Sequence, residues 1–312
     1  MDEIFLYENK IYRYNHFGRY LKTKYGYPVH KVNIDAGFTC PNRDKVTGEG
    51  GCIYCNNRAF NKHAYRDIQK TIRQQLAEGI AQKKRIYGVD KIIAYFQAYT
   101  NTFDSVEYLK SQYEVIREFP EIVGLSIGTR PDCIDSEKLD LIESYAKDYL
   151  VWVEYGLQSA NDNTLDKINR GHNFQQFLDA ISITRSRAIF ICVHLILGLP
   201  FENHADMMRT AERLAGLPIA GIKLHNMCVV KGTELEKLFN EGKYTPPTFD
   251  EYVHAAVDFL ERIPYEITVQ RLTADSPPDI FVAPEWAKDR WKVVNEIDAE
   301  LRRRDSFQGI KV

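Results

Sequence analysis

The chain has 312 residues, of which 44% are apolar and 27% charged, and its formal net charge is −2. This composition excludes a disulfide-stapled mini-protein and a disordered chain, and it fits one large domain or two ordinary ones. The small net charge excludes a globally basic protein, so any nucleic-acid site must be a local patch. No apolar run reaches the roughly 18 residues of a membrane span, and the acidic start lacks the pattern of a signal peptide. We therefore expect a cytoplasmic protein with reduced thiols and no membrane partner.

Short β-branched or apolar runs alternate with amphipathic stretches, which predicts strands alternating with helices. The expected strands are 30–35, 91–97, 122–128, 150–157, 190–197 and 219–225, and the expected helices are 66–86, 104–118, 136–147, 173–187 and 204–215. Such alternation implies parallel pairing through right-handed crossovers. Six units are too few for a closed eight-stranded barrel, so we expect an α/β fold that forms a partial, open (β/α)6 TIM-like barrel. A doubly wound sheet is the alternative.

Two proline-containing breaks, at residues 245–247 and 276–278, mark a C-terminal region with expected helices near 249–262 and 285–304. We expect a short N-terminal basic and aromatic extension over residues 1–27 and a core over residues 28–240. The remaining residues, 241–312, are expected to form an α-rich extension packed on that core.

Six cysteines in a reducing compartment need a reason other than disulfides. Cys40, Cys52 and Cys55 fall within sixteen residues, CPNRDKVTGEGGCIYC, whose glycines allow the backbone to turn tightly. This spacing indicates a metal or cluster site; a zinc site with a fourth ligand elsewhere and a redox pair are the alternatives. A cubane iron–sulfur cluster normally takes four thiolates, so three would leave one iron open to a ligand. Cys133 and Cys192 are expected to be buried packing residues.

Polar side chains follow each expected strand at its C-terminal end, which is the end where parallel α/β folds build their sites. Any one of these clusters is compatible with an ordinary turn, but six at one rim indicate a pocket. The residues that we single out besides the cysteine trio are Gln97, Ser126, Gly128, Arg130, Glu154, Gln158, Arg170, His194, Gly198, Lys223, His225, Asn226 and Cys228.

Several segments resemble, in order and spacing, the radical S-adenosylmethionine (radical SAM) superfamily. They are residues 40–55, AYFQAYTNT (94–102), GLSIGTRPDCI (124–134), VEYGLQSANDNTLDKINRGH (153–172), HLILGLP (194–200) and IKLHNMCVVKGTELE (222–236). More narrowly, together with RLTADSP (271–277), they resemble the YhcC/YtqA-type family, a relative of Elongator-type radical SAM domains. The resemblance covers essentially the whole chain. The eleven residues between Cys40 and Cys52 depart from the superfamily's commonest spacing, Cys-x3-Cys-x2-Cys, and fit the narrow family.

The resemblance implies that Cys40, Cys52 and Cys55 hold a [4Fe–4S] cluster whose fourth iron chelates S-adenosylmethionine (SAM). One electron, from a donor such as flavodoxin or ferredoxin, then cleaves SAM to a 5′-deoxyadenosyl radical that abstracts a substrate hydrogen. The cofactor carries the difficult chemistry, while the protein positions it and shields it from side reactions.

The resemblance also assigns roles to the rim residues. Arg170 resembles the arginine that pairs with the SAM carboxylate, a role that suits a guanidinium fork. Gln97 corresponds to a contact with the SAM amino group and Gln158 to one near the ribose or methionine. The remaining expected cofactor residues are Ser126, Gly128, Arg130, Glu154, His194 and Gly198, of which Gly198 would let adenine approach closely. A structural Arg170–Glu154 ion pair is the alternative for those two residues.

Four further residues of the sixth strand and its end, Lys223, His225, Asn226 and Cys228, are expected to face substrate. Histidines on apolar strands are commonly hydrogen-bonded core residues, which is the alternative for His194 and His225. Cys228 lies at the rim and is the one scattered cysteine that we consider as a catalytic group.

The segment between Asn9 and Asn33 contains six basic and six aromatic residues and no acidic one. Basic residues attract phosphates and aromatic rings stack on bases, so we expect tRNA to bind near Lys10–Lys31. An amphipathic element whose tyrosines pack against the core is the alternative.

The family resemblance implies modification of a tRNA wobble uridine, from carboxymethylaminomethyl toward aminomethyl, on a base splayed out of a loop. Two other functions stay open on the sequence alone. One is a radical SAM enzyme that acts on a peptide or small metabolite, and the other is a non-enzymatic zinc-binding module.

Overall fold

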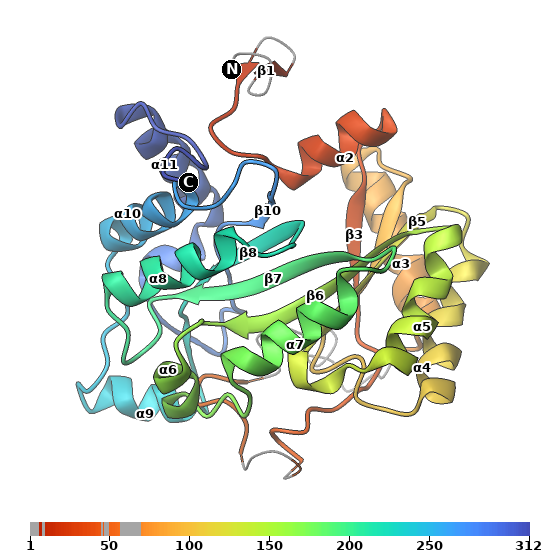
Figure 1. Cartoon of the computed structure of the whole chain (residues 1–312), viewed down its shortest axis with the longest axis horizontal. Helices are drawn as coiled ribbons and strands as arrows, with labels where there is room; N and C mark the ends of the chain where they lie inside the picture. Colours follow the sequence, from red (N-terminus) through yellow and green to blue (C-terminus); the bar gives the residue numbers. More distant parts are fainter. Residues whose placement is uncertain (1–5, 8–9, 45, 47–49, 57–69) are drawn as a thin grey trace.

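The computed structural model describes residues 6–7, 10–44, 46, 50–56 and 70–312. Parts of the expected N-terminal extension, the cysteine loop and the start of the helix expected over 66–86 lie outside the described residues. Seven parallel strands form one sheet that curls into an open half-barrel (Figure 1). In spatial order they are β10 (Thr268–Arg271), β8 (Gly221–Asn226), β7 (Phe190–Leu197), β6 (Leu150–Gln158), β5 (Ile122–Thr129), β4 (Ile92–Phe96) and β3 (His30–Ile34).

The expected open barrel is confirmed, and the doubly wound alternative is wrong. Each strand lies beside its neighbour in the chain, without the reversal of order that defines a doubly wound sheet. All six expected strands form within about two residues of the expected bounds. The seventh strand, β10, extends the expected set of six. It was not predicted, because its four residues lie between two proline-containing breaks.

Helices cover the outer face of the sheet. They are α3 (Ile72–Tyr87), α4 (Val106–Tyr113), α5 (Ser136–Ser144), α7 (Phe174–Thr184), α8 (His204–Ala215) and α10 (Phe249–Leu260). The short helix α6 (Asp162–Lys167) lies at the C-terminal rim, where Leu165 packs in one apolar cluster with Tyr54. Thr71, Asn173, Asn203 and Thr248 close capping boxes at the starts of α3, α7, α8 and α10. Two expected helices end early in 3₁₀ turns, η2 (Glu114–Glu118) and η4 (Tyr145–Lys147).

The remaining elements flank the barrel. They are β1 (Leu6–Tyr7), β2 (Lys10–Ile11), α2 (Phe17–Tyr25), η3 (Pro131–Cys133), β9 (Val229–Val230), α9 (Glu234–Asn240), β11 (Phe281–Ala283), η5 (Glu285–Lys288) and α11 (Arg290–Arg303). In the described part of the chain, no helix combines the length and apolarity that a membrane span requires.

Strand β6 shows how the sheet separates a helix-facing core from a polar interior. Val153, Tyr155 and Leu157 are fully buried in the main apolar core with the outer helices. The alternate residues, Trp152, Glu154 and Gly156, point to the other face because side chains alternate along a strand. Trp152 packs with Phe17 of α2, whereas Glu154 binds polar side chains of other strands. The inner face thus provides an enclosed polar chamber.

The two ends of the chain together close the base of the barrel. The Val269 amide of β10 donates to the Asn15 carbonyl at 2.8 Å, so residues 15–16 pair with the free edge of the last strand. The Asn15 amide in turn donates to Gln308 Oε1 at 2.9 Å. Across the barrel opening, Lys31 Nζ of β3 donates to Gln270 Oε1 of β10 at 2.7 Å. The proposed divisions near residues 27 and 240 stay predictions, although segments on both sides of each division share this sheet.

We predict that Phe17→Ala destabilises the whole barrel, because Phe17 is buried and its ring meets Trp152 edge-on with centroids 5.2 Å apart. The free energy of unfolding should fall by about 3–5 kcal/mol, as for other buried phenylalanines. Phe201→Ala is the matched control, since Phe201 is 50% exposed, and it should change stability by about 0.5 kcal/mol or less. Urea unfolding measures both, and equal losses would contradict a packed role for the N-terminal segment.

Candidate functional site

The cysteine loop follows β3 at the C-terminal end of the barrel and is held by the segment after α6. Asn42 Nδ2 donates to Cys52 Sγ at 3.5 Å and to the Asn169 carbonyl at 2.6 Å. Asn169 Nδ2 donates back to the Gly51 carbonyl at 2.8 Å, and the Ile53 amide donates to the Ile168 carbonyl at 3.1 Å. These reciprocal bonds fix the positions of Cys52 and its neighbours relative to the rim.

Arg170 lies beside this loop, in a place that suits an anionic sulfur centre. Its Nη1 donates to Cys52 Sγ at 3.5 Å, and its Nη2 donates to the Gly156 carbonyl. The side chain is 7% exposed, and its Nε has no hydrogen-bond partner among the described residues. The Arg170–Glu154 ion pair, the alternative weighed from the sequence, does not form, because Glu154 pairs with lysines instead.

Arg130 positions the Arg170 loop from strand β5. Its guanidinium forms two hydrogen bonds with the Asp132 carboxylate, at 2.9 and 2.7 Å, and Nη1 donates to the Arg170 carbonyl at 2.7 Å. Gly171, with φ of +73°, allows this close approach, since a Cβ there would lie 2.7 Å from Asn42 Oδ1. Arg130 therefore supports the site with a guanidinium that is already engaged.

The residues around the cysteines suit an iron–sulfur cluster. All three cysteines are free of disulfides, and thiolates are the usual protein ligands of such clusters. Asn42 and Arg170 both donate to Cys52 Sγ, and such N–H donors stabilise a metal-bound sulfur and fix its orientation. Asn42 Oδ1 and Arg170 Nε are buried without a partner in the described chain, so the site has unused polar capacity.

A second polar centre surrounds Glu154 in the barrel interior. Its fully buried carboxylate accepts from Lys31 Nζ at 2.6 Å, from His194 Nε2 at 2.6 Å, and from Lys223 Nζ and Ser126 Oγ. The Lys223 and Lys31 ammonium nitrogens lie 4.2 and 4.8 Å from the centre of the Tyr95 ring. Five strands, β3, β4, β5, β7 and β8, thus each place one side chain around the Glu154 carboxylate of β6.

The Glu154 centre is held ionised by its cations. Burial alone raises the pKa of the Glu154 carboxyl, but Lys223 and Lys31 outweigh burial and hold the pKa well below its usual value. Burial lowers the pKa of Lys223 to about 7, because Glu154 is shared with Lys31 and compensates its charge only in part. Burial, together with Lys223, lowers the pKa of His194 to about 4, so this ring is neutral at pH 7.

Glu154, Cys192 and His194 place potential metal-ligand atoms within 4.8 Å of one another. Two ammonium groups already bind this carboxylate, and they repel an added cation. Burial also raises the pKa of Cys192 to about 12, which keeps it a thiol. The centre is therefore an ion-pair network, and Cys192 packs as expected.

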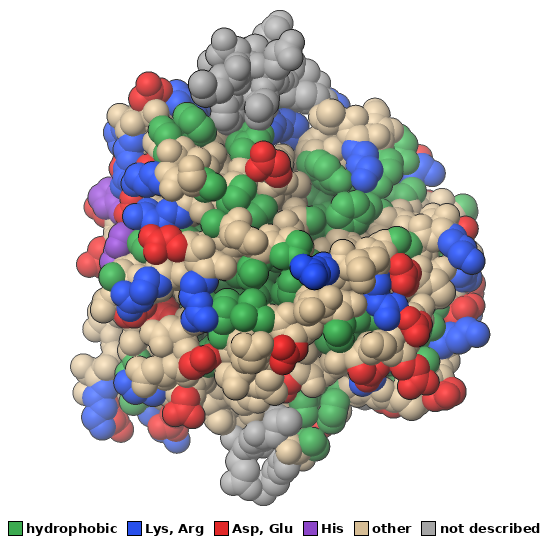
Figure 2. All heavy atoms as spheres, viewed as in Figure 1, with side chains coloured by type: hydrophobic (Ala, Val, Ile, Leu, Met, Phe, Trp, Pro, Cys, Tyr) green, Lys and Arg blue, Asp and Glu red, His purple; other side chains and the backbone are tan. Residues whose placement is uncertain are grey.

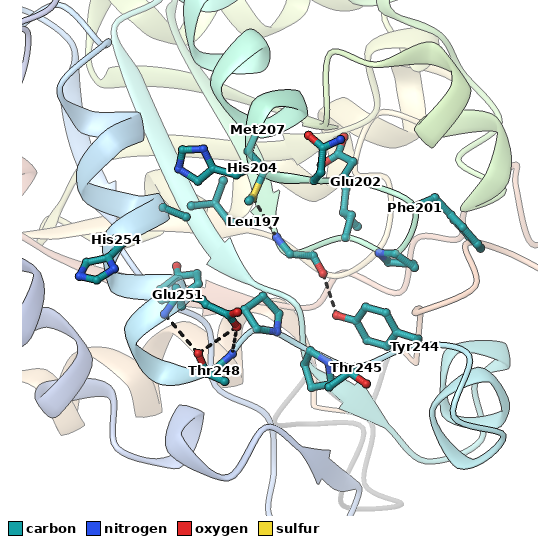
Figure 3. A pocket seen from close by; sticks show the side chains of 18 of the residues that line it. Leu197, Phe201, Glu202, His204, Met207, Tyr244, Thr245, Thr248, Glu251 and His254 are labelled. Carbon is teal, nitrogen blue, oxygen red and sulfur yellow. Dashed lines mark hydrogen bonds between the residues drawn. The ribbon is translucent and has the colours of Figure 1, made fainter.

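The structure places Gly198 beside a groove of about 850 Å³ between the loop after β7 and helix α10 (Figure 3). A Cβ at Gly198 would lie 2.7 Å from Pro247 Cδ, so Pro247 makes the close approach that requires glycine. The Gly198 amide donates to Met207 Sδ at 3.3 Å, and its carbonyl accepts from Tyr244 Oη at 2.7 Å. None of the other expected site residues lines this groove.

Asn226 and Cys228 hold the C-terminal segment in place. Asn226 Oδ1 accepts from Thr273 Oγ1 at 2.7 Å and from the Ala274 amide at 2.8 Å, and its Nδ2 donates to Cys228 Sγ at 3.1 Å. Burial raises the pKa of the Cys228 thiol to about 12, which disfavours a thiolate nucleophile. Both side chains, with His225, line a small cavity of about 40 Å³ next to Tyr54.

The cysteine rim and the Glu154 centre meet at Gly156, whereas Gly198, Asn226 and Cys228 lie outside both. A Cβ on Gly156 would lie 2.8 Å from Arg170 Nη2 and 2.9 Å from Gln158 Nε2, so both side chains need this glycine. The Gly128 carbonyl accepts from both the amide and Nδ2 of Asn101. Gln97 lies at the end of β4, where its amide donates to the Ile34 carbonyl.

Sequence reasoning missed the site contacts of Asn42, Lys31, Tyr95 and Gln270. Gln270 and Arg271 occur in the alternating run ITVQRL, residues 267–272, whose β-branched residues are the signal for a strand. From the sequence, Lys31 is interpreted only as part of the basic segment. Its place in the expected strand 30–35 is also compatible with a side chain that points into the barrel.

The basic and aromatic segment expected to bind tRNA lies at the opposite end of the barrel from the cysteines (Figure 1). Tyr14 and Phe17 are buried in the core, and Lys31 binds Glu154 inside the barrel. Lys24 remains exposed and lies over the rings of Tyr20 and Phe190. Figure 2 shows acidic and basic side chains interspersed over the face in view. RNA binding by this segment stays a prediction. Tyr14, Phe17 and Lys31 already pack or form ion pairs inside the protein, so they are not available to contact RNA.

Comparison with known proteins gives matches over most of the chain. The sequence model of the Radical SAM superfamily matches residues 40–214, and that of the Radical SAM C-terminal domain matches residues 219–303. YtqA, an uncharacterised protein of Bacillus subtilis (strain 168), is 36% identical over 98% of this chain and 94% of its own length. YhcC of Escherichia coli (strain K12) is 38% identical over 92% of both chains.

Two further matches are more distant. The structure of Elp3 from the archaeon Methanocaldococcus infernus, with an N-terminal deletion, covers 90% of this chain and 64% of that chain with a TM-score of 0.65. Its 18% identity makes this a likeness in fold. The tRNA uridine(34) acetyltransferase of Dehalococcoides mccartyi (strain CBDB1) is 27% identical over 52% of this chain and 35% of its own length.

The chain is a member of the radical SAM superfamily of enzymes, because the superfamily's sequence model matches residues 40–214. The half-barrel of parallel strands, with three cysteines after its first strand, agrees with this assignment. Within that superfamily it belongs to the YhcC-type family, which is related to Elongator proteins. The resemblance stated from the sequence is therefore confirmed. Family membership implies a [4Fe–4S] cluster and SAM as cofactors.

We predict that Glu154→Gln strongly destabilises the protein, because it leaves the Lys31 and Lys223 ammonium groups without their shared counter-ion. Breaking a buried pair of this kind costs about 3–5 kcal/mol, which urea unfolding measures. The double variant Glu154→Gln/Lys223→Met should recover part of the loss, since it removes one of the unpaired charges.

Glu118→Gln is the matched control, because Glu118 pairs with Arg73 at the surface, and its unfolding midpoint should change little. An equally small effect of Glu154→Gln would contradict the ionic network.

Proposed function

We propose that Cys40, Cys52 and Cys55 hold a [4Fe–4S] cluster that binds SAM, and that the enzyme modifies a wobble uridine of tRNA. The single observation that carries the cofactor assignment is the environment of Cys52. Two N–H donors from separate segments, Asn42 and Arg170, converge on its sulfur at the C-terminal rim of a radical SAM barrel. When bound, the cluster and SAM supply a 5′-deoxyadenosyl radical that abstracts hydrogen from the substrate.

The chain's own residues bind and enclose these groups. Arg170 has an Nε atom without a partner in the described chain, and we assign the guanidinium to the carboxylate of SAM. Gln97 and Gln158, at the ends of β4 and β6, are assigned to the amino and ribose parts of SAM. Arg130 positions Arg170 through its carbonyl. The apolar layer around Trp152 and Phe17 closes the far end of the chamber to water.

The proposal of tRNA as substrate is supported by the relatives. The tRNA uridine(34) acetyltransferase shares sequence with half of this chain, and position 34 is the wobble position. We propose a uridine side chain as the group that is modified, from carboxymethylaminomethyl toward aminomethyl, with flavodoxin or ferredoxin as electron donor. Lys24 and its neighbouring rings on α2 would then contact the RNA at a distance from the modified base.

The cluster assignment predicts the result of anaerobic reconstitution with iron and sulfide. The parent protein should become brown and contain about four irons per chain, as one cubane requires. Cys52→Ala should lose the chromophore and SAM cleavage under reductant, whereas Cys228→Ala should retain both, because Cys228 lies outside the trio. A colourless parent protein that contains zinc would contradict the proposal and favour a zinc-binding module.

The substrate assignment predicts that tRNA from cells lacking this protein accumulates a precursor wobble uridine, detected by nucleoside mass spectrometry. Complementation with the parent gene should remove the precursor, and complementation with Cys52→Ala should not. In vitro, tRNA binding should weaken as salt increases. An unchanged nucleoside profile together with no tRNA binding would contradict the proposal and favour a peptide or small-metabolite substrate.

A further inference from the structure

The barrel interior contains more positive than negative charge in the part that the structure describes. Lys31 and Lys223 share the one carboxylate of Glu154. Arg271, at the end of β10, pairs with Lys223 in the strand register, and no described carboxylate lies within ion-pair distance of its guanidinium. Buried cations are costly unless a counter-charge compensates them. Lys223 is buried and Arg271 is partly buried, so an anion between them would compensate charge that Glu154 alone does not.

Unused hydrogen-bond donors lie on the same two strands. Gln270 Oε1 accepts from Lys31, but Gln270 Nε2 is buried without a partner in the described chain. His225 Nε2 is also buried without one, and the His225 ring stacks on His194 with centroids 5.5 Å apart. The charge of Arg271 acts on both His225 and Lys223, which places these groups around the same space.

Two of the side chains that bind Glu154 are partly accessible to solvent. The side chains of Lys31 and His194 are 19% and 17% exposed although they bind the fully buried Glu154. His225 lines the small cavity that also contains Tyr54 of the cysteine loop. The cations around Glu154 therefore lie close to the cysteine rim. Glu154 binds the lysines and Gly156, two residues further along β6, binds Arg170 of the rim.

We propose that Arg271, Lys223, His225 and Gln270 form a subsite for a carboxylate of the substrate, which supplies this anion. This inference rests on the proposed function, and it assigns these residues to the carboxylate of the carboxymethylaminomethyl side chain. A guanidinium fork pairs with both oxygens of a carboxylate, and the neighbouring donors satisfy its remaining lone pairs. Arg271 is thereby a specificity residue, distinct from Arg170 at the cysteine rim.

The subsite also distinguishes substrate from product. A carboxymethylaminomethyl uridine brings a carboxylate to Arg271 along with its ammonium group, whereas an aminomethyl uridine brings the ammonium group alone and is repelled. The product should therefore leave the site more readily than the substrate.

The test measures binding of the reconstituted full-length enzyme to two anticodon stem-loop RNAs by fluorescence anisotropy. The RNAs are identical except that one wobble uridine has a carboxymethylaminomethyl group and the other has the neutral carbamoyl analogue. The parent enzyme should bind the carboxylate RNA about tenfold or more tightly, a difference of about 1.4 kcal/mol or more. Arg271→Gln should remove this preference, and Arg271→Lys should retain part of it.

Two controls separate the possible outcomes. Arg117→Gln changes an arginine that pairs with Asp148 on the outer surface and should keep the full preference. Gln270→Leu should weaken the preference without the loss of a charge. SAM binding, measured in parallel, should be unchanged by Arg271→Gln.

The proposal is overturned if Arg271→Gln binds RNA and keeps the parent's preference. It is also overturned if that variant loses SAM affinity while the RNA preference stays, because the anion would then be the carboxylate of SAM. If the parent binds neither RNA, the proposed tRNA function fails and this inference fails with it.

Discussion

The barrel depends on one buried carboxylate that strands from both sides of the sheet must reach. Glu154 lies in the middle of the central strand, and its partners come from β3, near one edge, and β8, near the other. A flat sheet would keep these strands far apart, so the curl and the ion pairs require each other. A buried charge without its partner is costly. Sheet curvatures that separate Glu154 from Lys31 or Lys223 are therefore unfavourable, and the network favours one curvature of the sheet.

Strand β6 connects this network to the cysteine rim. The Gly156 carbonyl, two residues beyond Glu154, accepts from Arg170 and lies 3.2 Å from His172 Nε2. Arg170 reaches Cys52 from there. The position of the sulfur centre is therefore set by the same strand that carries the buried charge, which explains why two chemically different sites lie in register.

Features that depend on local spacing could be predicted from the sequence. The cysteine trio, the order of six strands and the rim positions follow from periodicity and motif spacing. Partner choice could not be predicted, because it depends on tertiary distance. Arg170 binds a cysteine sulfur and Glu154 binds lysines, although their opposite charges were also compatible with an Arg170–Glu154 pair. Gly198 shows the same limit, since a glycine indicates that something approaches closely but not that it is Pro247. The short strand β10 was missed because proline-containing breaks surround its few β-branched residues.

The closure of the barrel base has a consequence for the order of assembly. The bonds from Arg13 and Asn15 to residues 305–308 join positions 292 and 293 apart in the chain. They form only after residues 305–308 have left the ribosome, whereas the cysteine loop and strands β3 to β8 are synthesised much earlier. Loop-closure entropy over such separations makes this contact a late folding event. The nascent enzyme thus passes through a stage in which the strands that carry the cysteine loop are complete while the base of the barrel is still open.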